Sequence, residues 1–125
     1  MLIRNQQFDA FSTAQRISFD NRMLVHLKRF FPEQYDGLGE ERVVEAVQYG
    51  IARAATYGMT AERDVCKYID LMFALGRDFD TDPRFDWAQP ILTDPDTPDA
   101  TARIELLYED ALARIRAAAE AAKQP

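Results

Sequence analysis

The sequence predicts an all-α protein, a compact bundle of about four main helices, and two observations support this fold class. Apolar residues recur three or four positions apart through four long stretches, and no stretch alternates apolar with polar residues for long enough to indicate a sheet. Most of the glycines and prolines fall between these stretches, where helices end. Because the chain has 125 residues, of which 47% are apolar, we expect residues 1–125 to form a single helical domain.

The first helix is expected over residues 9–31, because Pro32 disfavours helical geometry at the residue before it. Its apolar stripe is broad and polar residues occupy the other face, a pattern typical of a core helix. The stripe contains Phe8, Phe11, Phe19, Met23, Leu27 and Phe30. A homodimer formed through the first three of these phenylalanines is an alternative use of the same stripe.

A turn-rich connection is expected over residues 32–39, followed by a second helix over 40–57. Gly58 suits the left-handed position that follows a helix, and Thr60 is expected to cap a third helix. Gly76 should end that helix in the same manner as Gly58 ends the second one.

A short helical turn is expected over residues 87–92, and the last helix is expected to begin with Thr97 as its cap and Pro98 at its first position. Its end is rich in alanine, which favours helix but buries little surface. We therefore expect residues 117–125 to fray.

The net charge of the chain is concentrated between residues 78 and 99, which we call the acidic segment. The segment contains seven aspartates and one arginine, so its charge of −6 equals that of the whole chain. It also holds the single tryptophan and four of the six prolines. We expect a long acidic, aromatic loop between the third and fourth main helices and predict that it binds a partner protein through Asp78, Phe79, Asp80, Asp82, Arg84, Phe85 and Trp87.

In this hypothesis the aromatic residues anchor the partner and the aspartates select a basic surface on it. The alternative is a purely structural role, in which aspartates accept hydrogen bonds from nearby backbone N–H groups. Asp80 or Asp82 would then pair with Arg77 or Arg84 to hold the loop.

The sequence gives little indication of a metal site. Asp78, Asp80 and Asp82 imitate the first half of an EF-hand loop, but Pro83 and Gln89 stand where that loop requires glycine and a bidentate glutamate. Zinc is not expected either, because the chain has one histidine and one cysteine. We therefore expect neither a metal nor another cofactor.

Catalysis is not expected from these residues. Ser12 and Ser18 lie on the same predicted helix as His26, where neither serine can reach the imidazole. Cys66 lies in an apolar helical pattern and is interpreted as a small buried hydrophobic residue. A small hydrolase built around the aspartates is a remote alternative, since it would need one carboxyl group with a raised pKa in a cleft.

The composition also bears on partners and location. An acidic chain with a pI near 4.7 and no cluster of lysine and arginine is a poor ligand for nucleic acid. The corner at Gly58 resembles a helix-turn-helix, but Asp64 stands where that motif requires an apolar residue. No apolar run is long enough to span a membrane and no leader pattern is present, so we expect a cytoplasmic protein without membrane contact.

Several short motifs resemble a family of small uncharacterised helical proteins encoded in bacterial type VI secretion clusters, near spike-tip or effector genes. The resemblance covers residues 3–92 and rests on the segments at residues 30–32, 50–54, 57–60, 62–65, 68–73 and 76–82 and on Trp87 and Ala88. It implies a non-enzymatic accessory protein, an adaptor or chaperone that binds a secretion effector or a spike-tip protein. An immunity protein that neutralises a cognate toxin is the alternative that the same resemblance implies.

Overall fold

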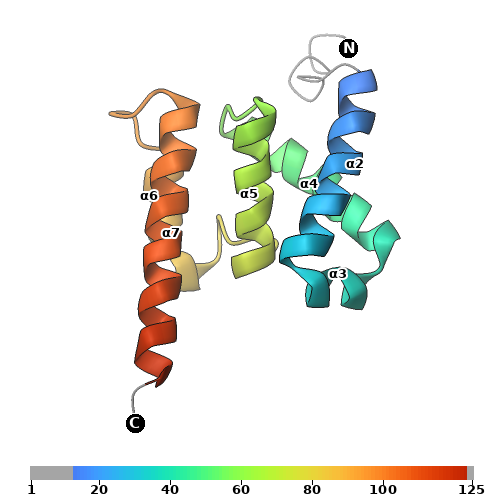
Figure 1. The fold of residues 1–125 in the computed structure, drawn as a ribbon. Coiled ribbons are helices and arrows are strands. Elements are labelled where there is room, and N and C mark those ends of the chain that lie inside the picture. The colour runs from blue at the N-terminus through green and yellow to red at the C-terminus, as the bar shows by residue number, and fades with distance from the viewer. Residues whose placement is uncertain (1–12, 124–125) are drawn as a thin grey trace.

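The computed structural model describes residues 13–123 and confirms the all-α fold class (Figure 1). Within that range no strand is present, and six α-helices and one 3-10 turn replace the expected count of about four helices. The elements are α2 (Thr13–Phe30), α3 (Pro32–Leu38), α4 (Glu40–Thr56), α5 (Glu62–Leu75), η1 (Pro83–Phe85), α6 (Ala88–Leu92) and α7 (Ala100–Lys123). Phe8, Phe11 and Ser12 lie outside the described residues.

Helix α5 occupies the centre of the molecule. In Figure 1 it stands between α7 on one side and α2 and α4 on the other, with α3 beneath the end of α2. Every one of these helices contributes apolar side chains to one continuous core. The fully buried members include Leu27, Val43, Val47, Met59, Tyr68, Ile69, Phe79, Leu92, Ile104 and Leu107.

The connection at residues 32–39 is a helix rather than the expected run of turns. Pro32 stands in the first turn of α3, where its missing N–H costs nothing, and Glu33 favours the positive helix end. The side chain of Tyr35 is buried and anchors this short helix to the core. Gly39, with a φ of 86°, then separates α3 from α4.

Both glycines mark helix ends as predicted, but not in the same manner, and the capping predictions are wrong. Gly58 follows the cap residue Tyr57 with a φ of 79°, whereas Gly76 is itself the cap residue of α5, with a φ of 134° and a ψ of 154°. At the start of α5, however, Ala61 rather than Thr60 holds the cap position, and it makes no side-chain cap bond. The Thr97 hydroxyl instead donates to the carboxylate of Asp94, since α7 begins only at Ala100.

The acidic segment is not a single long loop. It contains η1 and α6, and α6 packs against α7 through the buried residues Ala88 and Leu92. Helix α7 is helical to Lys123, and fraying of the end of the chain stays a prediction. The exposed part of α7 beyond Leu112 extends past α5 in Figure 1.

Helices α4 and α5 pack against each other at Gly50. A Cβ atom at Gly50 would lie 2.6 Å from Ile69 Cγ1 and 2.9 Å from the sulfur of Met72. These distances are shorter than side chains tolerate, so the absence of a side chain at Gly50 lets α4 and α5 approach this closely. We call this contact the α4–α5 seam.

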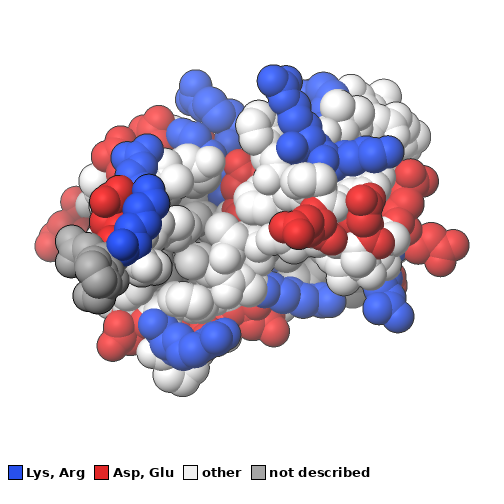
Figure 2. Space-filling view, turned by 60° about the horizontal axis from the view of Figure 1, so that its bottom comes forward, with Lys and Arg blue, Asp and Glu red and all other residues white. Residues whose placement is uncertain are grey.

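Acidic and basic side chains intermingle on the face shown in Figure 2, around a broad uncharged area. Among residues 13–123, no helix is both long enough and apolar enough to cross a lipid bilayer.

Candidate functional site

The structure distributes the predicted partner-binding residues of the acidic segment between the core and the surface. Phe79 is fully buried, and its ring lies 5.1 Å from that of Tyr68 on α5, measured between centroids. Phe79 is therefore a core residue, and its side chain offers no surface to a partner. The interpretation of Phe79 as an exposed anchor is therefore wrong.

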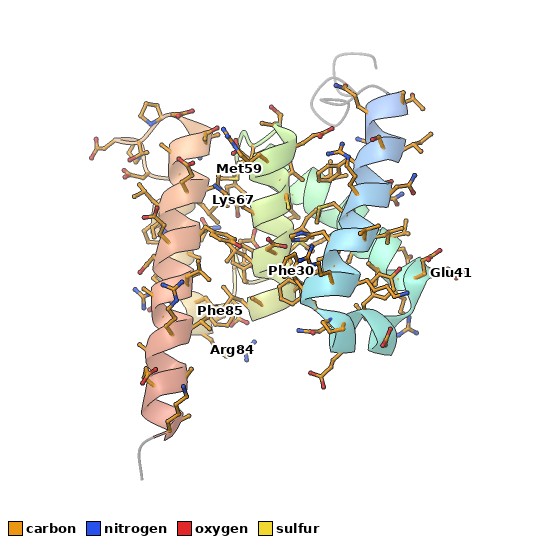
Figure 3. All side chains as sticks on the ribbon, viewed as in Figure 1. Phe30, Glu41, Met59, Lys67, Arg84 and Phe85 are labelled. Carbon is orange, nitrogen blue, oxygen red and sulfur yellow. The ribbon has the colours of Figure 1, made fainter. Side chains whose placement is uncertain are left out.

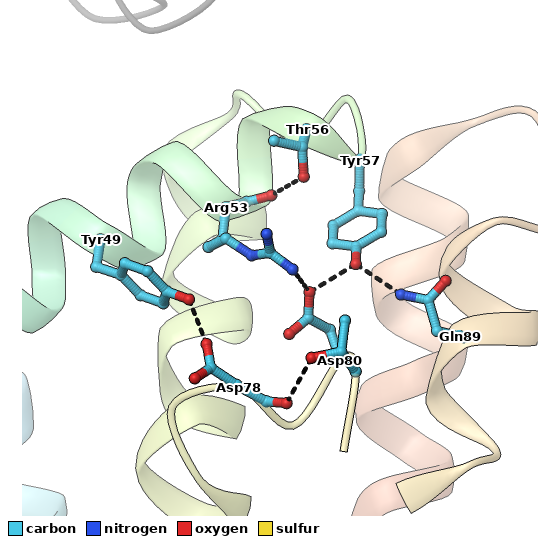
Figure 4. Close-up of polar contacts among 8 residues, drawn as sticks. Tyr49, Arg53, Thr56, Tyr57, Asp78, Asp80 and Gln89 are labelled. Carbon is cyan, nitrogen blue, oxygen red and sulfur yellow. Dashed lines mark hydrogen bonds and ion pairs between the residues drawn. The ribbon is translucent and has the colours of Figure 1, made fainter. Parts of the chain in front are cut away.

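Asp80 is the centre of a buried polar cluster (Figure 4). Its side chain is fully shielded from solvent, and one carboxylate oxygen accepts hydrogen bonds from the Arg53 guanidinium and from the Tyr57 hydroxyl, the latter at 2.6 Å. Gln89 on α6 donates to the same tyrosine oxygen at 2.8 Å. The cluster thus ties the acidic segment to the end of α4, and we call it the Asp80 cluster.

The environment of the Asp80 cluster raises the pKa values of two of its members. Desolvation, followed by the hydrogen bond to Asp80, raises the pKa of Tyr57 to about 12. The hydrogen bond to the same carboxylate is the chief reason why the pKa of Arg53 is raised as well.

Two further aspartates of the acidic segment have hydrogen-bond partners within the protein. Asp78 accepts a hydrogen bond from the Tyr49 hydroxyl, and the Arg77 guanidinium lies 3.9 Å from the centroid of the Tyr49 ring. Asp82 pairs with Arg84 at 2.7 Å and also accepts the backbone N–H of that arginine. The structural alternative is thus confirmed for Asp82 and Arg84, whereas Asp80 pairs with Arg53, which neither version of the hypothesis named.

The remaining predicted partner-binding residues, Phe85 and Trp87, pack against each other at the surface. Figure 3 shows Arg84 and Phe85 on η1, near the lower part of α5. The rings of Phe85 and Trp87 meet edge to face with centroids 6.2 Å apart, and both are half-buried. Arg114 on α7 covers Trp87, its guanidinium 4.5 Å from the ring centroid. Partner contact by this stack stays a prediction.

A groove of about 700 Å³ lies between α3, α4 and the end of α5, and we call it the α3–α5 groove. Apolar side chains of all three helices line it, and its charged side chains are Arg42, Glu45 and Arg77. Neither arginine forms an ion pair with another residue in the range 13–123. The apolar lining residues are Leu38, Ala46, Met72 and Phe73.

A second polar cluster joins α2 to α5 and was not predicted from the sequence. His26 Nε2 lies 2.7 Å from Asp70 Oδ1 and 3.9 Å from the sulfur of Cys66. One ligand atom from each of the three side chains lies within 4.8 Å of the others. We call these three residues the His26 cluster. The expectation against zinc counted only histidine and cysteine and overlooked the carboxylate that completes a set of three.

The His26 cluster is partly open to solvent. His26 and Cys66 line a pocket of about 500 Å³ between α2 and α5, together with Arg22 and Glu62, which form an ion pair of 2.8 Å. Asp70 lies deeper, and its second oxygen accepts a 3.4 Å hydrogen bond from Tyr108 of α7. We call this region the α2–α5 seam.

Desolvation is the main cause of the raised pKa values of Cys66 and Asp70. It raises the pKa of the Cys66 thiol to about 11, with a further contribution from the negative charge of Asp70. Burial raises the pKa of Asp70 as well, although the hydrogen bond from His26 opposes this effect. In the isolated protein at neutral pH, the thiol is therefore protonated.

Comparison of the chain with family models, with curated proteins and with solved structures gives no match. The resemblance to proteins of type VI secretion clusters therefore stays a prediction.

Proposed function

We propose that this chain is a non-enzymatic accessory protein that binds a segment of a partner protein in the α3–α5 groove. The observation that carries the proposal is the combination of an apolar lining with Arg42 and Arg77 among the lining residues. An apolar surface recess of this size can receive one or two side chains of a docked segment. The partner segment should therefore present an apolar anchor.

The charge of the groove specifies a second property of the partner segment. Two arginines and one glutamate line it, although the chain as a whole carries a net charge of −6. An acidic side chain beside the apolar anchor would pair with one of these arginines, which the range 13–123 leaves without an ion pair. We therefore propose an acidic, amphipathic segment as the occupant of the groove.

The resemblance to proteins of type VI secretion clusters supports a secretion effector or a spike-tip protein as the source of this segment. The chain would then act as its adaptor or chaperone in the cytoplasm. A cognate toxin bound by the same surface is the alternative, in which the chain acts as an immunity protein. The two roles differ in one cellular outcome, because only an immunity protein rescues cells that express the partner.

The proposal is tested by affinity capture from the native host with matched variants. Ala46→Glu places a larger, acidic side chain in the groove, and Ala113→Glu makes the same change on the exposed face of α7. We expect the wild type and the Ala113→Glu variant to retain the same effector or spike-tip protein. The Ala46→Glu variant should lose it, with a Kd at least about tenfold higher for the purified pair.

Ala46→Lys separates shape from charge at the same position. An acidic partner segment should bind the lysine variant more tightly than the glutamate variant, because both side chains are similarly long but only lysine attracts it. Equal binding by the wild type and the Ala46→Glu variant would remove the groove from the interface. Co-expression with the captured partner then distinguishes an adaptor from an immunity protein.

A further inference from the structure

The geometry of the His26 cluster distinguishes between two kinds of chemistry. In a nucleophilic Cys–His pair, the thiol contacts one imidazole nitrogen and the orienting carboxylate contacts the other. Here Asp70 and Cys66 both approach Nε2 of His26. The carboxylate therefore competes with the thiol for one nitrogen instead of orienting the ring for proton transfer, and a cysteine nucleophile is not supported.

A shared metal ion requires instead that three ligand atoms surround one point, and the three atoms here lie within 4.8 Å of one another. Tetrahedral coordination at usual bond lengths would separate the nitrogen and oxygen ligands by about 3.3 Å and the nitrogen and sulfur ligands by about 3.6 Å. The observed separations are 2.7 Å and 3.9 Å. Side-chain shifts of about half an ångström would adjust these two separations, and the sulfur of Cys66 and the carboxylate of Asp70 would have to approach each other by up to about 1 Å.

We propose that His26, Cys66 and Asp70 bind a divalent transition-metal ion of the Zn²⁺ type, with a fourth coordination position facing the pocket between α2 and α5. A thiolate, an imidazole and a carboxylate together favour zinc or cobalt over magnesium or calcium, which prefer oxygen ligands alone. The thiolate and the carboxylate together also balance the charge of a divalent ion.

The surroundings of the three ligands support the proposal. The Tyr108 hydroxyl donates to the second oxygen of Asp70, which fixes the orientation of the carboxylate, as groups around metal ligands commonly do. Two of the ligands, Cys66 and Asp70, lie one helical turn apart on α5, and the third projects from the neighbouring α2. A metal ion at this position would cross-link the two helices.

Binding involves a defined exchange of protons and no electron transfer. A bond forms between the metal ion and the sulfur of Cys66 as the S–H bond breaks, and the thiol proton passes to solvent. Nε2 of His26 must likewise offer its lone pair, so the proton that this nitrogen shares with Asp70 passes to solvent, and the neutral ring keeps its proton on Nδ1. Affinity for the metal should consequently rise with pH.

The experiment is a titration of the full chain, without an affinity tag, with Co²⁺ as a spectroscopic probe for Zn²⁺. The chain has a single cysteine and a single histidine, so each signal has one assignment. We expect a sulfur-to-cobalt charge-transfer band in the near ultraviolet, loss of that band when Zn²⁺ displaces Co²⁺, and a Zn²⁺-dependent shift of the one imidazole in NMR spectra.

Variants identify the ligands. Cys66→Ser should abolish the charge-transfer band, and His26→Gln and Asp70→Asn should each raise the Kd by about tenfold to a hundredfold. Asp36→Asn, which removes an exposed carboxylate on α3, should leave binding unchanged. Circular dichroism checks that each variant keeps its helical content.

The proposal is overturned if the folded wild type shows no charge-transfer band with Co²⁺. It is equally overturned if the band persists at unchanged affinity in His26→Gln and Asp70→Asn, because the thiol would then bind the metal alone.

Discussion

Helix α5 contacts α4 and α2 through seams that differ in how completely they are filled. At the α4–α5 seam, Gly50 lets the side chains of Ile69 and Met72 contact the backbone of α4. At the α2–α5 seam, a pocket of about 500 Å³ separates parts of the two helices and exposes a histidine and a cysteine. The same central helix is therefore packed without space for a side chain at Gly50 and borders a pocket where it faces α2.

The aspartate on each side shows the consequence of this difference. Asp80, in the acidic segment beside the end of α4, pairs with an arginine, whose guanidinium is never a metal ligand. Asp70, in the α2–α5 seam, pairs with a histidine, a residue type that commonly serves as a metal ligand. Burial alone does not make an aspartate functional, because the chemistry of its partner decides whether the pair can respond to a ligand.

The largest loss of stability is expected for Phe79→Ala in the core. Removal of this fully buried ring should lower the free energy of unfolding by about 3–5 kcal/mol, measured by urea denaturation. Phe85→Ala, at a half-buried position of the same segment, should cost clearly less. Equal costs would mean that Phe79 is no more a core residue than Phe85.

The second-largest loss of stability is expected for Asp80→Ala. The substitution leaves the half-buried guanidinium of Arg53 and the hydroxyl of Tyr57 without their shared partner, at a cost of about 2 kcal/mol. Asp82→Ala removes an exposed pair with Arg84 and should change stability far less. A smaller loss for Asp80→Ala than for Asp82→Ala would contradict the structural role of the Asp80 cluster.

Gly50→Ala tests how tightly the α4–α5 seam is closed. The added methyl group would overlap Ile69 and Met72, and we expect a loss of about 1–3 kcal/mol in spite of the better helix propensity of alanine. Gly37→Ala on α3 meets no atom within 4 Å, so the same change there should be neutral or slightly stabilising. Differential scanning calorimetry of both variants separates packing from propensity.

The smallest effect concerns thiol reactivity in the α2–α5 seam rather than stability. Alkylation requires the thiolate, and burial disfavours that charged form, so the rate in metal-free protein should rise with pH toward a midpoint near 11. Asp70→Asn removes a nearby negative charge and should lower that midpoint. The rate of reaction with iodoacetamide at a series of pH values measures this midpoint. A wild-type midpoint of 9 or below would show that the α2–α5 seam is more open than described.

Local signals predicted much of the fold. Pro32, Gly58 and Gly76 marked helix ends correctly because their backbone constraints act within a few residues. The predictions of caps at Thr60 and Thr97 are wrong because the hydrogen bond of a cap depends on the residue at which the tertiary structure starts the helix. Helix α3 was missed because Gly37 and Pro32 also suit a turn, and burial of Tyr35, which favours the helix, is a tertiary contact that the local sequence does not show.

The candidate sites depended on contacts that local patterns do not encode. His26 and Asp70 are separated by 44 residues, and Arg53 and Asp80 by 27. Among the aspartates of the acidic segment, nothing in composition distinguished the buried Asp80 from the exposed Asp86. A helical-register signal did exist for half of the His26 cluster, because Cys66 and Asp70 lie four residues apart on one helix face.

The stack of Arg114 on Trp87 gives the protein an internal optical probe. Trp87 is the single tryptophan, and it reaches from the start of α6 to the guanidinium on α7. Its fluorescence emission therefore reports whether the C-terminal helix stays docked on the acidic segment. In the proposed cobalt titration, emission would therefore report the docking of α7 independently of the absorbance that tests metal binding.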